Sequence, residues 1–114
     1  MRSRPASPKW ARFYILDAKN QPVQVSDQTE WARWMAENDV LFRRTLLEDF
    51  GIAITTRFRG VSEPPPRDTP LFVTRVVGRV AEGNESYGAD TLDEALEKHE
   101  QLLQKLLLAL AGQR

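Results

Sequence analysis

Residues 92–111 constrain the fold of this 114-residue chain more than any other segment. Thr91 is followed three residues later by Glu94, which is a capping box, and the apolar pattern stops at Gly112. Between these signals the apolar residues recur every three to four positions, which predicts one stripe along a helix of about 30 Å. A helix with such a stripe must bury it, and the segments before it predict a sheet that can cover it.

Three upstream segments have the composition of β-strands. Residues 52–59 and 71–80 alternate with a period of two, which predicts one buried and one solvent-facing side for each strand. Residues 41–47 precede a tight turn and are predicted as a third strand, with a helix as the alternative. The proline-rich residues 61–70 are expected to form an exposed loop, and residues 86–88 a last edge strand. These segments predict an antiparallel meander.

The N-terminal part is predicted to add a hairpin and a first helix. Residues 12–17 are rich in aromatic and β-branched side chains, and residues 23–25 can pair back on them. Asp27 and Glu30 resemble a capping box that opens a helix over residues 28–37. The apolar face of this helix is formed by Trp31, Trp34 and Met35.

We therefore expect an α+β fold with an antiparallel sheet of about four strands and with both helices packed on one face of it. Residues 10–114 should form a single domain. Residues 1–9, which contain two prolines and have little to bury, are predicted to be a disordered tail.

His99 is the only histidine and lies within the apolar stripe of the last helix. A metal site would need a second ligand one turn away, but positions 95 and 103 are Ala and Leu. Acid–base catalysis would need a pocket and an orienting carboxylate, and the pattern indicates neither. We predict a core histidine whose ring nitrogens bond to a backbone carbonyl or a tyrosine hydroxyl.

Several arginines are predicted on the solvent-facing sides of two strands. Such a face can bind phosphates or carboxylates, although it can also be an ordinary solvent face with arginine stems lying over apolar surface. Arg43 or Arg44 could join the group if the strands are neighbours. Phe58 and Phe72 alternate to the other side, so stacking on single-stranded nucleic acid is poorly supported. The candidate residues are Arg57, Arg59, Arg75 and Arg79.

The last helix carries more leucine than one face of a short sheet requires. Part of this surplus is predicted to contact a partner protein or a second copy of the chain, giving a homo-oligomer through the helix. The alternative is that Trp10, Phe13 and the first helix cover it. The candidate interface residues are Leu103, Leu106, Leu107 and Leu110.

The composition and the absence of known motifs exclude several classes of site and of enzyme. The chain has no cysteine, which removes disulfides, thiol nucleophiles and cysteine zinc sites, and none of the common phosphate-loop, zinc-protease or serine-hydrolase motifs occurs. The longest apolar run, residues 106–111, is far shorter than the roughly 20 residues of a membrane-spanning helix. We expect a cytoplasmic, non-enzymatic protein with no cofactor, no metal and no membrane association.

The chain contains, in order, RFYILD, QPV, WARW, ITTRFRG, PLFVTRVVG, Tyr87 and T..EAL..HE. In this order and spacing it resembles a family of small, uncharacterised proteins carried by phages and prophages, over residues 10–103. It departs from the family at Arg79, where related chains show a second glycine, and in its leucine-rich extension of the last helix. The resemblance implies a phage or prophage setting, in which small cofactor-free proteins often act by occupying a surface on a host or defence protein.

Two main hypotheses of function follow. The first is a binding protein that inhibits or modulates a host or defence-system protein, for example an anti-defence inhibitor of the anti-CRISPR kind. The second is an accessory protein that binds nucleic acid through the arginine face. The formal charge of zero gives no global attraction to nucleic acid, although residues 1–80 carry a net +4 and residues 81–114 a net −4. An enzyme that uses His99 is a third and weaker hypothesis.

Overall fold

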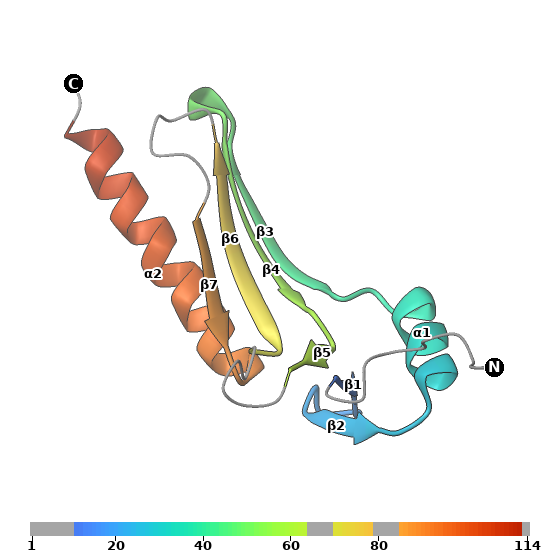
Figure 1. Ribbon diagram of the computed structural model, residues 1–114. Coiled ribbons are helices and arrows are strands. Elements are labelled where there is room, and N and C mark those ends of the chain that lie inside the picture. Colours follow the sequence, from blue (N-terminus) through green and yellow to red (C-terminus); the bar gives the residue numbers. More distant parts are fainter. Residues whose placement is uncertain (1–10, 64–69, 79–84, 113–114) are drawn as a thin grey trace.

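The computed structural model describes residues 11–63, 70–78 and 85–112, and it contains two antiparallel sheets and two helices (Figure 1). The predicted α+β class is confirmed. The tail at residues 1–9, Arg79 and most of the proline-rich loop lie outside the described residues. The elements are β1 (Arg12–Leu16), β2 (Pro22–Val25), α1 (Gln28–Glu37), β3 (Leu41–Leu47), η1 (Glu48–Phe50), β4 (Ile52–Phe58), β5 (Val61–Ser62), β6 (Phe72–Gly78), β7 (Glu85–Ala89) and α2 (Leu92–Ala111).

The larger sheet has the strand order β3-β4-β6-β7, and each pair is antiparallel. The predicted meander is therefore confirmed, including its last edge strand, and residues 41–47 form a strand rather than the alternative helix. The tight turn between β3 and β4 ends at Gly51, whose φ of 66° is in the left-handed region that favours glycine.

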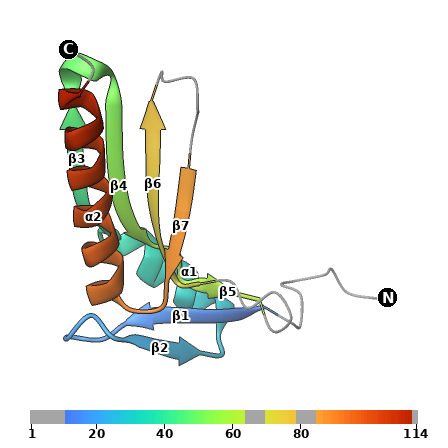
Figure 2. The same ribbon diagram turned by 90° about the vertical axis from the view of Figure 1, so that its left-hand side faces the viewer.

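The helix α2 packs against β4, β6 and β7 and covers one face of this sheet (Figures 1 and 2). We call this the inner face and the opposite one the outer face. The core between α2 and the sheet contains Ile52, Ile54, Val76 and Leu102 at one end, where Leu103, Leu106 and Leu110 pack against it. At the other end it contains Phe58, Phe72 and Ala95. Among the described helices, none combines the length and apolarity that crossing a bilayer requires.

The smaller sheet has the order β2-β1-β5, and α1 packs against β1 and β2 (Figure 1). The placement of α1 differs in part from the prediction, because α1 lies mainly against the N-terminal hairpin, and only Trp34 and Met35 reach the inner-face cluster around Phe58. Trp31 lies against Phe13 with ring centroids 4.9 Å apart, and Trp34 meets Phe58 edge-on at 6.0 Å. The strand β5 was predicted as part of a loop, but its backbone pairs with β1.

Local signals fix both helices at the predicted residues. Asp27 accepts a hydrogen bond from the Thr29 backbone N–H at 2.9 Å, and Thr91 Oγ1 accepts one from the Glu94 N–H at 3.1 Å. The Glu94 carboxylate accepts in return from the N–H of Asp90, one residue before the cap. These bonds satisfy backbone donors that the first turn of a helix leaves without partners.

Candidate functional site

His99 is 0% exposed and lies between α2 and the inner face of the sheet. Its Nδ1 is 2.8 Å from Thr56 Oγ1 on β4, and its Nε2 is 2.9 Å from Thr45 Oγ1 on β3. The prediction of a core histidine is confirmed, but its partners are threonine hydroxyls and not a carbonyl or a tyrosine.

The hydrogen bonds around His99 form a connected chain. Thr74 Oγ1 is 2.7 Å from Thr56 Oγ1 and 3.3 Å from the carbonyl oxygen of Ala95, and its single proton can go to either of them. If it goes to Ala95, Thr56 donates to Thr74 and accepts from Nδ1, and Nε2 accepts from Thr45; if it goes to Thr56, these directions reverse. In both arrangements each ring nitrogen has a threonine hydroxyl as its partner.

Burial lowers the pKa of His99 below its ordinary value of 6.5, and the positive charge of Arg43 lowers it further, while Glu100 acts in the opposite direction. The ring is therefore neutral at pH 7, with both nitrogens bonded within the fold. A group that is shielded from solvent in this way cannot reach a substrate, so His99 holds α2 to β3 and β4 as a structural residue.

One threonine partner of His99, Thr56, could have been found in the sequence together with Thr74, to which Thr56 is hydrogen-bonded. Thr56 and Thr74 occupy the buried positions of β4 and β6, where their neighbours on the same side are Ile, Phe and Val. A polar residue in such a buried series needs a hydrogen-bond partner, and the histidine in the apolar stripe of α2 is a matching one. Among the described residues, no group of three His, Asp or Glu side chains is placed to hold a metal ion.

The outer face of the large sheet carries the candidate binding residues. The strand register places Arg44, Thr55 and Arg75 in one row across β3, β4 and β6. Because neighbouring strands are about 4.8 Å apart, the Cα atoms of the two arginines flank Thr55 at a separation of roughly 10 Å. Arg57 lies two residues further along β4 on the same face, and all three arginines are exposed.

None of these three arginines has a hydrogen-bond or ion-pair partner among the described residues. Arg43 behaves differently because successive residues of a strand point to opposite faces. It reaches the inner side and forms an ion pair with Glu100 of α2 at 3.1 Å. Arg59, just beyond β4, donates to the carbonyl oxygen of Pro70 at 3.2 Å. Of the predicted arginines, Arg57 and Arg75 therefore share the outer face, and Arg44 joins them.

Aliphatic side chains accompany these arginines. The adjacent row consists of Leu46, Ala53 and Val77, of which Leu46 is 46% and Val77 is 43% exposed. Val73 pairs with Arg57 in the row on the other side. We call the six residues of the first two rows, together with Arg57, the outer patch. They are Arg44, Leu46, Ala53, Thr55, Arg57, Arg75 and Val77.

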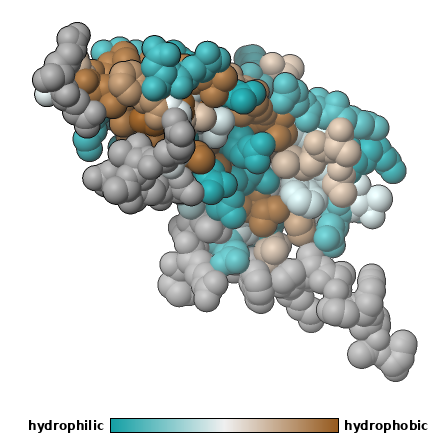
Figure 3. Space-filling view, turned by 90° about the horizontal axis from the view of Figure 1, so that it is seen from above, coloured by the Kyte–Doolittle hydropathy of each residue, from teal (hydrophilic) through white to brown (hydrophobic). Residues whose placement is uncertain are grey.

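The predicted leucine interface is divided by the structure. Leu103, Leu106 and Leu110 pack against the core, whereas Leu107 is 41% exposed. Leu108, on the solvent side of α2, is the most exposed at 75%. Figure 3, which views the end of the molecule where α2 stops, shows hydrophobic side chains gathered there beside hydrophilic ones.

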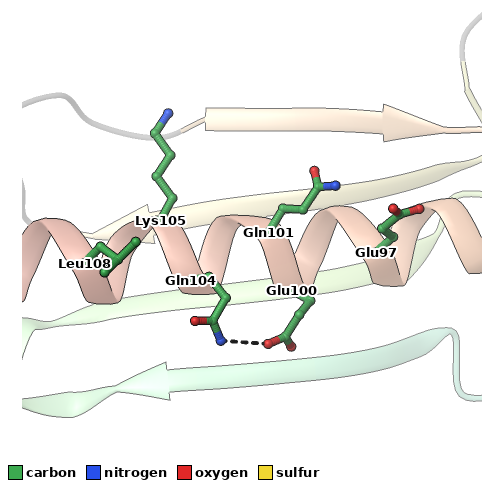
Figure 4. A pocket seen from close by; sticks show the side chains of 6 residues that line it. All are labelled: Glu97, Glu100, Gln101, Gln104, Lys105 and Leu108. Carbon is green, nitrogen blue, oxygen red and sulfur yellow. Dashed lines mark hydrogen bonds between the residues drawn. The ribbon is translucent and has the colours of Figure 1, made fainter.

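Leu108 also borders a shallow, open depression of about 560 Å³ along the solvent side of α2 (Figure 4). The six residues that line it all belong to this one helix, and Gln104 donates to Glu100 within it at 2.9 Å. Gln101 and Lys105 extend to the opposite side from that pair (Figure 4). The depression is therefore an ordinary solvent face of a helix and lacks the walls of a ligand site.

Comparison of the chain with protein-family models, with curated proteins and with solved structures gives no match. The function is therefore inferred from the residues of the chain itself. Among the described residues, the outer patch is where unpaired charge and exposed apolar area occur together on one sheet face.

Proposed function

We propose that the chain is a non-enzymatic binding protein that covers a surface of another protein with its outer patch. The observation that supports this proposal is the presence of three arginines without described acidic partners on an open sheet face, next to exposed Leu46 and Val77. In the phage or prophage setting that the resemblance implies, the partner is a host or defence-system protein in the bacterial cytoplasm. Occupying its surface would inhibit or modulate it.

The composition of the outer patch is that of a protein interface. Arginine is enriched at interfaces because its guanidinium forms paired hydrogen bonds with carboxylates while its stem packs on apolar groups. Burial of exposed aliphatic area contributes about 25 cal/mol per Å² to association, and the arginine row supplies specificity beside it. A partner with carboxylates next to an apolar surface would complement both rows.

Nucleic acid is the second candidate, because unpaired guanidiniums also bind phosphates. The outer patch contains no aromatic residue for stacking on bases, and Phe58 and Phe72 are buried on the inner face. Binding to phosphates would weaken steeply with salt, by roughly the first power of the salt concentration for each phosphate contact.

The test is co-purification from a bacterial host that expresses the tagged chain, with mass spectrometry of the bound proteins. We expect one host protein to be enriched by the natural chain and lost with Arg44→Glu/Arg75→Glu. Arg33→Glu, a charge reversal at an exposed position of α1, is the matched control and should retain the partner. Enrichment that disappears after nuclease treatment would support nucleic acid instead, and enrichment that the double variant keeps would contradict the proposal.

Self-association through the exposed Leu107 and Leu108 is a separate proposal, because both residues lie at one end of α2. It is checked by the mass of the purified chain in solution. A monomeric mass would eliminate it, and a dimeric mass that Leu107→Gln/Leu108→Gln abolishes would support it.

A further inference from the structure

We infer that the outer patch binds an acidic amphipathic α-helix of its partner, seated over β4. This inference rests on the proposed function and adds the chemistry and shape of the bound segment. Three features of the outer patch support it: the sizes of its side chains, their spacing, and the way the inner face of the same sheet is already covered.

Side-chain size makes a seat along the middle of the outer patch. Two of the three outward residues of β4 are the small Ala53 and Thr55, both partly buried, and the third, Arg57, is exposed near the end of the strand. The flanking positions on β3 and β6 carry the larger, exposed Leu46 and Arg44 on one side and Val77 and Arg75 on the other. The Cα atoms of the two flanking strands are about 10 Å apart, which is close to the 10–12 Å diameter of a helix with its side chains. A helix over β4 would therefore have an arginine on each side.

The spacing along the strands also fits a helix. Outward residues of one strand are roughly 6.7 Å apart, so Val77 and Arg75 differ by that step along β6. One turn of a helix advances about 5.4–6 Å. A helix aligned with the strands would thus place an apolar residue by Leu46 and Val77 and carboxylates one turn away, beside Arg44 and Arg75.

The inner face provides a precedent in the same molecule. There, α2 places Leu102 and Leu106 against Ile54 and its neighbours, and Glu100 of α2 pairs with Arg43 of β3 at 3.1 Å. This sheet therefore already packs against one helix whose apolar stripe has a carboxylate at its flank. The outer face carries three arginines beside aliphatic residues but has no helix over it among the described residues.

The bound segment should carry a leucine-type stripe with Asp or Glu on both flanks. A display library of 20-residue helical peptides, selected against the full-length chain at low salt, tests this directly. We expect the enriched peptides to have that pattern. We expect Arg44→Glu/Arg75→Glu to reduce their affinity by at least about tenfold, the equivalent of about 1.4 kcal/mol. Arg33→Glu should leave the affinity unchanged.

A second variant tests the seat itself. Thr55→Trp fills the space over β4 without changing the charge, and we expect it to reduce peptide binding by at least about tenfold while urea unfolding shows a folded domain. The inference is overturned if no peptide is enriched, if the enriched peptides lack acidic residues, or if Thr55→Trp binds them as the natural chain does. If co-purification still returns a host protein that depends on Arg44 and Arg75, only the helix is wrong and the proposed function stands.

Discussion

Thr56→Val is predicted to destabilise the fold although it hardly changes the shape of the side chain. Thr56 is 0% exposed, and its hydroxyl is hydrogen-bonded to His99 Nδ1 at 2.8 Å and to Thr74 Oγ1 at 2.7 Å. Valine keeps the branched shape and leaves no cavity of note, so the effect of the substitution comes from the two lost hydrogen bonds.

The size of this effect follows from which atoms lose a partner. A buried donor that is left unsatisfied costs about 1–3 kcal/mol. Whichever ring nitrogen of His99 carries the proton, Nε2 keeps its bond to Thr45 while Nδ1 is left as a buried donor or acceptor without a partner. Thr74 keeps its bond to the carbonyl of Ala95. We therefore expect the free energy of unfolding to fall by about 2 kcal/mol.

Urea unfolding followed by tryptophan fluorescence measures this loss. With a denaturant dependence of about 2 kcal/mol per M, the midpoint should fall by about 1 M. The matched control is Thr55→Val on the same strand, because Thr55 faces outward and is only partly buried. That substitution should change the free energy of unfolding by no more than about 0.5 kcal/mol. If the two valine variants were equally stable, the hydrogen-bond chain through His99 would not contribute as described.

Three further predictions concern α2. Folding lowers the pKa of His99 below 6.5, so the unfolded chain takes up a proton before the folded chain as the pH falls. The free energy of unfolding should therefore be constant above about pH 7 and decline below pH 6.5. The decline should be at most about 1.4 kcal/mol per pH unit. His99→Gln, measured by urea unfolding from pH 7.5 to 5, should remove this decline. Arg43 and Glu100 are 42% and 46% exposed, so a double-mutant cycle should give a coupling below about 1 kcal/mol that weakens with salt. Leu102→Ala should cost about 2–5 kcal/mol in thermal or urea unfolding, whereas Leu108→Gln should stay within about 0.5 kcal/mol.

Local signals were sufficient to predict both helices from the sequence. Asp27 and Thr91 cap them with side-chain oxygens, and these bonds depend only on residues two to three positions away. The meander was predictable for the same reason, since residues 52–59 and 71–80 alternate with a period of two and successive strands follow one another across turns. The apolar residues of the segment 41–47 fit neither the helical nor the strand period clearly, and its pairing with β4 shows that it is a strand.

The β1–β2 hairpin of the smaller sheet was predicted, but the addition of β5 was not, because this pairing joins distant parts of the chain. Val61 pairs with Phe13, 48 residues earlier. The chain reaches this pairing through Gly60, whose φ is 77°, and a Cβ there would lie 2.8 Å from Trp31 Nε1. The sequence identified both the apolar face of α1 and the hairpin, whereas the packing of one against the other is a tertiary contact that periodicity does not reveal.

The sequence was sufficient to predict an outward arginine face on the sheet, but not which residues lie next to one another on it. Alternation shows that Arg57 and Arg75 face outward, yet only the strand register shows that Arg44 and Arg75 flank Thr55. Arg43 and Arg44 are neighbours in a strand and therefore lie on opposite faces, but which of the two arginines faces α2 depends on the fold. The absence of acidic partners within the described residues is likewise a three-dimensional property.

The central claim is that the chain acts through its outer patch and that His99 only supports the fold. Capture of the host partner by Arg75→Glu and by His99→Gln, compared at a temperature where circular dichroism shows both variants folded, tests this claim most directly. Thr45→Val can replace His99→Gln if the latter does not fold. We predict that Arg75→Glu loses the partner while the His99 or Thr45 variant retains it. Retention by Arg75→Glu together with loss by the His99 or Thr45 variant would contradict the account.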